Sequence, residues 1–227
     1  MPIQTEMVDI TVNGNSVSGY LAKPEGNGPF PSVVVIQEWW GLEEHIKDVA
    51  RRFANEGFVA LAPDLYHGEV MTEPSEAQKA MMALDMNRAS KELLKAADYL
   101  NNMSEVSGVG AIGFCMGGGL ALTLACDNPN VKAVAPFYGA NPQPIEKVAN
   151  LKGPILAIYA EHDNFSNEQV RNDLEAALKQ HGKQFQTTVY PDTQHAFFND
   201  SRPQIYDAEA AKDAWQKALA FFRKNLG

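Results

Sequence analysis

The chain has 227 residues, 45% of them hydrophobic and 21% charged, and a formal net charge of −9. This length and composition suit one α/β domain with a continuous apolar core. An integral membrane protein is excluded, because no run approaches the roughly 18 consecutive apolar residues of a membrane span. The acidic balance, without a run of Lys or Arg, argues against a nucleic-acid partner.

The N-terminus and the cysteines bear on the cellular compartment. Residues 1–11 carry Glu6 and Asp9, and they lack the basic and apolar regions of a secretory signal. The 2 cysteines are too few for the disulfide framework of a domain this size, which favours a reducing compartment. We therefore expect residues 1–227 to form a single cytoplasmic domain, a monomer or a weak homo-oligomer, with no membrane partner.

Hydrophobic periodicity predicts strands that alternate with helices. Continuous apolar runs are typical of strands buried on both faces of a parallel sheet, and apolar residues spaced three and four apart are typical of one helix face. We predict strands at residues 8–12, 17–22, 33–36, 58–61, 109–113, 131–137, 154–159 and 184–190. We predict helices around residues 46–53, 75–101, 116–126, 170–178 and 215–224.

Turn and cap residues refine these elements. Asn13 and Gly14 supply the positive φ angles of a tight turn, so the first two strands should pair as an N-terminal β-hairpin. Gly57 stands where the first helix should end, and Ser166 with Gln169 resembles a capping box at the start of a later helix. The alternation implies an α/β fold whose mostly parallel central sheet is covered by helices on both faces.

A cysteine stands at the exit of the predicted strand 109–113. Residues 113–117, Gly-Phe-Cys-Met-Gly, have the pattern Gly-x-Cys-x-Gly, the thiol version of a nucleophile elbow. The pattern places Cys115 on a strained turn at a helix N-terminus, where the helix dipole favours a thiolate. The alternative is a small buried cysteine in a glycine-rich turn.

An acid and a histidine follow two later strands. Asp163 comes after strand 154–159 and His195 after strand 184–190, which completes the order nucleophile, acid, histidine of α/β-hydrolases. An imidazole can accept the thiol proton and later protonate the leaving group, while a carboxylate fixes its tautomer. The alternatives are a loop carboxylate that caps a helix and an ordinary turn histidine.

The exit of strand 33–36 carries the sequence Gln-Glu-Trp-Trp-Gly. In this arrangement the oxyanion hole combines the backbone N–H after the nucleophile, here Met116, with one from this loop, for which Trp39 is the candidate. Glu38 then lies beside the thiol, where its negative charge is costly unless it accepts a proton or a hydrogen bond. The alternative for Glu38 is a solvated loop acid.

These motifs together resemble the dienelactone hydrolase family, the carboxymethylenebutenolidases. The similarity lies in Gln-Glu-x-x-Gly at 37–41, Ala-Pro-Asp-Leu-Tyr at 62–66, Gly-x-Cys-x-Gly-Gly at 113–118, the Asp163 loop and His-Ala-Phe at 195–197. The resemblance implies an α/β-hydrolase fold without a cofactor and a triad of Cys115, His195 and Asp163. It also implies that Glu38 holds the resting thiol until substrate displaces it.

One feature departs from this family. Its members grip the dienelactone carboxylate with two arginines, one of them a few residues beyond the histidine, and this chain has Asn199 in that region. We therefore expect a small-molecule ester or lactone as the substrate rather than dienelactone in particular. The candidate substrate-binding residues are Lys79, Arg88, Phe197, Asn199 and Arg202.

The sequence thus predicts a hydrolase of carboxylic esters or lactones that forms a thioacyl-enzyme intermediate. Two alternatives are an inactive hydrolase-fold binding module and a glutamine amidotransferase-like cysteine enzyme. The latter should carry an acid two residues after its histidine, where this chain has Phe197. We expect no metal, because His45 and His67 have no companions at a recognised ligand spacing.

Overall fold

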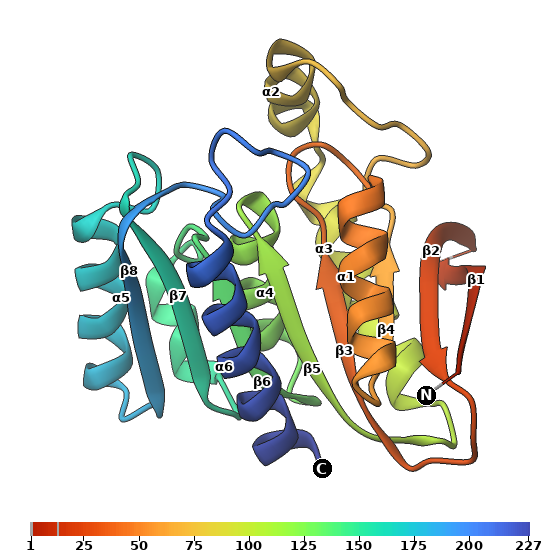
Figure 1. The fold of residues 1–227 in the computed structure, drawn as a ribbon. Helices are drawn as coiled ribbons and strands as arrows, with labels where there is room; N and C mark the ends of the chain where they lie inside the picture. The colour runs from red at the N-terminus through yellow and green to blue at the C-terminus, as the bar shows by residue number, and fades with distance from the viewer. Residues whose placement is uncertain (1, 13) are drawn as a thin grey trace.

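The computed structural model describes residues 2–12 and 14–227, and within them eight strands form one sheet (Figure 1). The strand order is β1-β2-β4-β3-β5-β6-β7-β8. The strands are β1 (Ile3–Val12), β2 (Asn15–Pro24), β3 (Phe30–Ile36), β4 (Val59–Pro63), β5 (Val106–Phe114), β6 (Val131–Phe137), β7 (Ile155–His162) and β8 (Phe185–Gln194). The helices are α1 (Glu44–Asn55), α2 (Pro74–Ala83), α3 (Met86–Asn101), α4 (Met116–Asp127), the 3-10 helix η1 (Ile145–Asn150), α5 (Glu168–Gln180) and α6 (Ala208–Leu226).

The predicted hairpin and parallel sheet are both confirmed. β1 and β2 pair antiparallel, β2 continues antiparallel onto β4, and the pairs from β4 through β3 to β8 are parallel. Gly14 has a φ of +85°, as a tight turn requires, while Asn13 of the predicted turn lies outside the described residues. The carboxyl ends of the parallel strands share one edge of the sheet, the upper edge in Figure 1.

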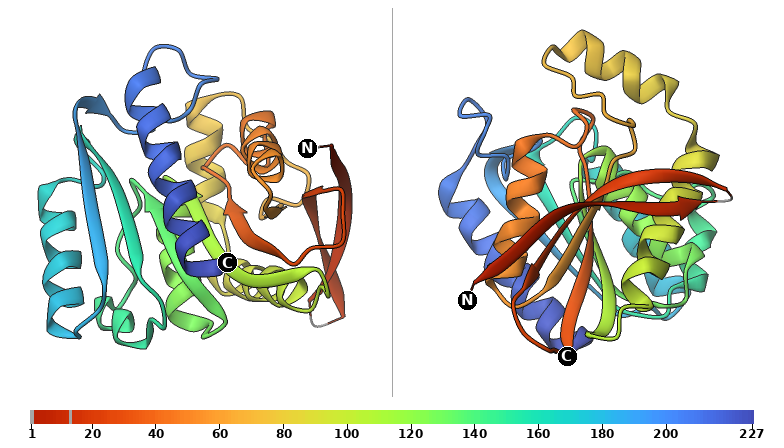
Figure 2. Two further views of the ribbon diagram at one scale, coloured as in Figure 1. Left: turned by 60° about the horizontal axis from the view of Figure 1, so that its bottom comes forward. Right: turned by 90° about the vertical axis from the view of Figure 1, so that its right-hand side faces the viewer.

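The sheet has an apolar core on each face. Val34 and Ile36 of β3 contribute to one buried cluster, with residues of α3, α4 and α5. Val33 and Val35 contribute to the other, with residues of α1 and α6. Figure 2 shows α1 and α6 on one side and α3 and α4 on the other. The continuous apolar run of this strand therefore serves two cores, as the sequence predicted.

The prediction of one continuous helix at residues 75–101 is wrong, because this segment forms two helices, α2 and α3. Leu84 is extended, with a ψ of 120°, and Asp85 begins a new helix. The Asp85 side chain accepts hydrogen bonds from the backbone N–H groups of Asn87 and Arg88, so it caps α3. Only Ala77 of α2 is buried, and α2 stands above the carboxyl edge of the sheet (Figures 1 and 2).

The predicted capping box is also wrong. Asn167 is the N-cap of α5 and accepts a hydrogen bond from the Val170 N–H at 3.2 Å. Ser166 instead donates its hydroxyl to the backbone oxygen of Tyr138 at 2.7 Å. The serine thus ties the loop before α5 to the exit of β6, a contact that local sequence could not reveal.

Across the described residues, no helix combines the length and the apolar character needed to cross a membrane.

Candidate active site

Cys115 lies on a strained turn between β5 and α4. Its backbone has φ 56° and ψ −118°, and α4 begins at the next residue. A Cβ on Gly113 would lie 2.0 Å from the Gly117 oxygen, and one on Gly117 would lie 2.4 Å from the backbone oxygens of Ile36 and Gln37. Both flanking positions therefore require glycine, because only then can β5, α4 and the exit of β3 approach so closely.

His195 and Asp163 form a hydrogen-bonded pair. The His195 Nδ1 lies 2.7 Å from Asp163 Oδ2, and Asp163 Oδ1 accepts from the backbone N–H groups of Phe165 and Ser166 at 2.7 and 2.9 Å. The carboxylate therefore fixes the imidazole with Nδ1 as the donor, which leaves Nε2 as the basic atom.

Burial and neighbouring groups act on this pair in opposite directions. Burial lowers the pKa of His195, but the hydrogen bond to Asp163 and the adjacent Cys115 outweigh it and raise that pKa to about 10. Burial raises the pKa of Asp163, but the hydrogen bond and charge of His195, together with the backbone N–H groups of Ser166 and Phe165, outweigh it and hold that pKa below its usual range. These neighbours thus stabilise the imidazolium that forms when His195 Nε2 accepts a proton.

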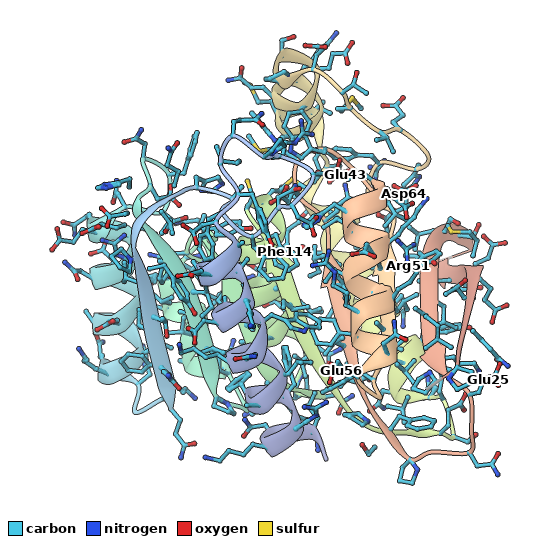
Figure 3. The ribbon with its side chains drawn as sticks, in the orientation of Figure 1. Glu25, Glu43, Arg51, Glu56, Asp64 and Phe114 are labelled. Atoms are coloured by element: carbon cyan, nitrogen blue, oxygen red, sulfur yellow. The ribbon has the colours of Figure 1, made fainter. Side chains whose placement is uncertain are left out.

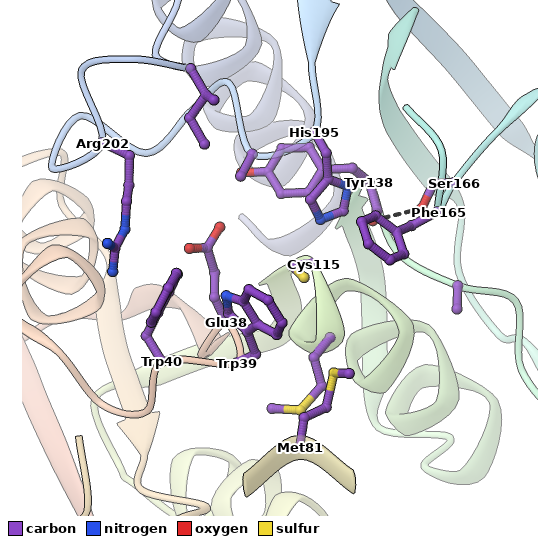
Figure 4. A pocket seen from close by; sticks show the side chains of 14 residues that line it. Glu38, Trp39, Trp40, Met81, Cys115, Tyr138, Phe165, Ser166, His195 and Arg202 are labelled. Carbon is purple, nitrogen blue, oxygen red and sulfur yellow. Dashed lines mark hydrogen bonds between the residues drawn. The ribbon is translucent and has the colours of Figure 1, made fainter. Parts of the chain in front are cut away.

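One cavity of about 270 Å³ joins these groups (Figure 4). Cys115 and His195 both line it, and aromatic, methionine and other apolar side chains make up most of the remaining wall. Its other lining residues are Glu38, Trp39, Trp40, Met81, Met116, Tyr138, Ala140, Phe165, Ser166, Ala196, Arg202 and Ile205. An apolar cavity with a few convergent polar groups is the usual form of a small-molecule site.

Glu38 is a buried acid in this cavity. It is 1% exposed, and Asn199 donates a hydrogen bond from Nδ2 to its Oε2 at 2.7 Å. Burial raises the pKa of Glu38 to about 7, although the Asn199 hydrogen bond opposes the rise. The interpretation of Glu38 as a solvated loop acid is therefore wrong, because the side chain has almost no contact with solvent.

The two proposed oxyanion-hole donors flank the thiol. Met116 is the first residue of α4, so its backbone N–H belongs to the first turn, where amides have no partner within the helix. Trp39 lies in the loop after β3, and both residues line the cavity. The close approach of Gly117 to Gln37 brings this loop to the elbow.

The five candidate substrate-binding residues differ in their positions relative to the cavity. Arg202 lines the cavity, whereas Lys79 and Arg88 are exposed side chains outside its lining. Arg88 instead donates to the backbone oxygen of Leu65 at 3.2 Å. Phe197 and Asn199 are fully buried and also lie outside the lining, with Asn199 behind Glu38. The structure therefore brings only Arg202 of this set to the cavity.

Arg202 contacts two neighbours in the wall of the cavity. Its guanidinium carbon lies 3.6 Å from the centroid of the Trp40 ring, and its Nη2 lies 3.8 Å from Glu43 Oε2. Glu43 precedes the first turn of α1, at the upper end of that helix in Figure 3. The positive charge is therefore paired with an acid of the protein.

Several lining residues were absent from the sequence-based candidates, among them Tyr138, Phe165 and Met81. Tyr138 follows β6, Phe165 follows Asp163, and Met81 belongs to α2. Tyr138 could have been found by examining the exit of strand 131–137, since sites in parallel sheets lie at strand exits. Phe165 and Met81 had no such signal, because a loop aromatic and a methionine on a surface helix are common without any role.

Glu161, His162 and Asp192 form an exposed group whose ligand atoms lie within 4.8 Å of one another. None of these residues lines the cavity, and exposed acidic groups of this kind are common. Cys126, the second cysteine, is buried, and burial raises its pKa to about 12. It therefore stays a thiol in the core.

Comparison with known proteins identifies the family of this chain. The family model described as the Dienelactone hydrolase family matches residues 17–226. The chain belongs to the dienelactone hydrolase family. The resemblance inferred from the sequence motifs is thereby confirmed, and so is the α/β-hydrolase fold.

Curated relatives align with this chain over almost its whole length. Protein usf of Aquifex pyrophilus is 41% identical over 232 residues, which cover 97% of this chain and 99% of the relative. A protein of Saccharolobus solfataricus named "Putative carboxymethylenebutenolidase" is 37% identical over 251 residues, with coverage of 93% and 95%. Among solved structures, a dienelactone hydrolase-like promiscuous phosphotriesterase from metagenomic libraries has a TM-score of 0.90 at 26% identity, covering 99% of both chains.

Proposed function

We propose that this protein hydrolyses carboxylic esters or lactones through a triad of Cys115, His195 and Asp163. The observation that carries the proposal is the convergence of three strand exits on one cavity. Cys115 is presented there on a strained elbow, and His195 faces it with Nδ1 fixed by Asp163 at 2.7 Å. A nucleophile, a base and a residue that orients the base are the parts that covalent acyl transfer requires.

The chemistry follows from these positions. His195 Nε2 takes the thiol proton, and the Cys115 sulfur attacks the substrate carbonyl to form a tetrahedral intermediate. The backbone N–H groups of Trp39 and Met116 stabilise its oxyanion. Collapse breaks the carbon–oxygen bond of the ester, and His195 returns the proton to the departing alkoxide. Water then hydrolyses the thioester and restores the thiol.

Glu38 regulates the resting thiol in this proposal. Its Oε2 is occupied by Asn199, while no group of the described protein lies within hydrogen-bond distance of its buried Oε1. Oε1 is therefore available to accept a hydrogen bond from the Cys115 thiol, and the carboxylate disfavours a permanent thiolate. Substrate that enters the oxyanion hole displaces this contact and releases the thiol to His195.

The proposed substrates are neutral esters and lactones. The cavity wall is mainly apolar, and Arg202 is already paired with Glu43 and stacked on Trp40. A substrate carboxylate would have to compete for this guanidinium with an acid that is already in place. A substrate screen should also include phosphotriesters, because the 26% identical structural neighbour is a promiscuous phosphotriesterase.

The test is Cys115→Ala beside Cys115→Ser, assayed with p-nitrophenyl acetate and simple lactones. Alanine removes the nucleophile and should abolish turnover while the fold survives, and iodoacetamide should inactivate the wild type. Folded Cys115→Ala protein with wild-type turnover would refute the proposal. A binding module has no activity to lose, and an amidotransferase would release ammonia from glutamine.

We further propose a single cytoplasmic domain. One sheet runs through the chain from β1 to β8, which supports one domain, and a reactive thiol is best preserved in a reducing compartment. The proposed oligomeric state, a monomer or a weak homo-oligomer, is testable by light scattering. The partners we propose are small-molecule esters or lactones, without nucleic acid or membrane.

A further inference from the structure

Tyr138 is fixed beside the nucleophile by its backbone. It follows β6, and its N–H donates to the Ile158 oxygen of β7 at 2.7 Å, while its own oxygen accepts from Ser166 Oγ at 2.7 Å. Cys115 follows the adjacent strand β5, and its N–H donates to the oxygen of Phe137, the residue before Tyr138, at 3.1 Å. Strand β6 thus places Tyr138 next to the elbow.

The packing of β6 against α4 makes this placement rigid. A Cβ on Gly139 would lie 2.4 Å from the backbone carbon of Gly118, so the exit of β6 presses on the first turn of α4. Tyr138 itself has a positive φ of 39°, which non-glycine residues rarely adopt. The side chain is therefore held in one place relative to Cys115.

The proton of the Tyr138 hydroxyl has no acceptor among the described residues. The residue is 1% exposed, Oη makes no hydrogen bond of full geometry there, and the nearby Phe198 backbone N–H, which partly offsets the rise that burial causes in the pKa of Tyr138, can only donate to it. Its ring lines the cavity, with its centroid 5.0 Å from that of His195. A buried hydroxyl that stays unpaired costs about 1–3 kcal/mol, so such an atom in a site points to a ligand.

Two further buried atoms of this cavity also lack a hydrogen bond of normal geometry. They are Glu38 Oε1 and His195 Nε2, within the part of the chain that the structure describes, and His195 lies beside the Cys115 thiol. Figure 4 shows the side chains of Glu38, Tyr138 and His195 around the space beside Cys115. The three atoms come from the exits of β3, β6 and β8, and all belong to residues that line one cavity.

We propose that Glu38 Oε1, Tyr138 Oη and His195 Nε2 together bind the water that hydrolyses the thioacyl intermediate. This inference rests on the proposed function, since it assigns the second half of the same reaction. Two of these atoms accept hydrogen bonds and one donates. A water that donates to Glu38 and His195 and accepts from Tyr138 keeps one lone pair free, and buried waters typically make about 3 hydrogen bonds.

The hydrolytic step balances with these groups. The free lone pair attacks the thioester carbonyl carbon while the water gives one proton to His195 Nε2. The carbon–sulfur bond then breaks, the sulfur leaves with the bonding electrons, and it takes that proton to restore the Cys115 thiol. The acyl group departs as a carboxylic acid, so one water and one thioester are consumed.

Tyr138 is suited to donate rather than to ionise. Burial raises its pKa well above its usual value, and the nearby charges of Glu38 and Cys115 raise it further. The hydroxyl therefore keeps its proton at any working pH. It holds the water without competing with His195 for the role of base.

The experiment is Tyr138→Phe, with Tyr159→Phe as the matched control. Tyr159 is also a buried tyrosine, but it lies outside the cavity lining. With p-nitrophenyl acetate, kcat/KM reports acylation and kcat reports the slower half-reaction. We expect Tyr138→Phe to lower kcat about 10-fold and KM in parallel, the effect of one lost hydrogen bond on deacylation alone.

The intermediate supplies an independent readout. Tyr138→Phe should give a burst of one p-nitrophenolate per active site, and mass spectrometry should find Cys115 carrying one acetyl group. Added hydroxylamine attacks the thioester without needing the water site, so it should restore turnover. Tyr159→Phe should match the wild type in kcat, in KM and in the amplitude of any burst.

Several results would overturn the inference. Unchanged kcat would mean that Tyr138 only packs, and an equal fall in kcat and kcat/KM without acyl-enzyme would place it in acylation. If the phenylalanine variant does not fold, Tyr138→Met removes the same hydroxyl and carries the same expectations. Failure of the proposed function is distinguishable, because the wild type would then show no esterase activity and no acetylated Cys115.

Discussion

Asn199 donates a hydrogen bond to Glu38 across 161 positions of the chain, with Nδ2 2.7 Å from Oε2. The amide is itself oriented, because its Oδ1 accepts hydrogen bonds from the N–H and hydroxyl of Ser201. Only its N–H₂ group is left to face the carboxylate. Asn199 therefore fixes one oxygen of Glu38 and leaves the other free in the cavity.

The first prediction concerns stability and pH. Burial raises the pKa of Glu38 from 4.5 to about 7, so between these values the folded chain keeps a proton that the unfolded chain has lost. Stability contributed by this group is full below pH 4.5 and falls as the pH rises to about 7. Gln cannot ionise. We therefore expect the free energy of unfolding of Glu38→Gln, relative to that of the wild type, to rise between about pH 5 and pH 8 by up to about 3 kcal/mol.

Urea unfolding of both proteins at the two pH values measures this difference. Glu161→Gln is the control, because Glu161 is exposed at the neighbouring exit of β7 and should leave the pH dependence unchanged. Parallel pH profiles for wild type and Glu38→Gln would show that the buried acid ionises as freely in the folded chain as in the unfolded one.

The second prediction concerns the reactivity of the thiol. A neutral glutamine no longer opposes the thiolate through its charge, so free Cys115 in Glu38→Gln should be alkylated and oxidised faster than in the wild type at neutral pH. Turnover should fall, since the variant loses the group that substrate displaces. The rate of iodoacetamide labelling and kcat are the two measurements. Equal labelling combined with unchanged kcat would remove Glu38 from the mechanism.

The third prediction is that Asp163→Asn lowers kcat by roughly 10³-fold or more. Asp163 Oδ1 accepts from the backbone N–H groups of Phe165 and Ser166, so the amide oxygen of an asparagine should take that side. Its N–H₂ group then faces His195 Nδ1 and forces the proton onto Nε2, the wrong tautomer for a base.

The matched control is Asp192→Asn near the carboxyl end of β8, where the side chain is 97% exposed. Because this side chain is on the surface, the substitution should change kcat by no more than about 2-fold. A folded Asp163→Asn protein with near-normal kcat would contradict the role of Asp163 in orienting the imidazole.

The fourth prediction is that neutral short-chain esters or lactones are hydrolysed at least as well as anionic dienelactones. The physical reason is that Arg202 is stacked on Trp40 and its Nη2 lies 3.8 Å from Glu43 Oε2, so a substrate carboxylate must compete with that acid for the guanidinium. The comparison is kcat/KM for the two substrate classes. A strong preference for dienelactone that disappears in Arg202→Gln would mean that the guanidinium leaves Glu43 to bind substrate.

Local patterns in the sequence predicted most of the strands and helices and the residues of the candidate triad. The run 33–36 is buried on both faces because consecutive side chains of a strand point to opposite sides, and a continuous apolar run can satisfy only a sheet that is covered twice. The elbow was recognisable at Gly113 and Gly117, since the close approach of strand and helix excludes a Cβ there. The alternation along β3 and the approach of Gly113 to Gly117 act between residues close in the chain, so a local pattern in the sequence can reveal them.

Tertiary structure alone decided what surrounds the nucleophile. No local pattern pairs Asn199 with Glu38, places Arg202 on Trp40, or directs Ser166 to Tyr138 instead of to its own helix. Each contact joins segments brought together only when the strand exits meet at one edge of the sheet. The free energy of a buried polar group depends on the partner it finds there, and that partner is fixed by the packing of the whole sheet.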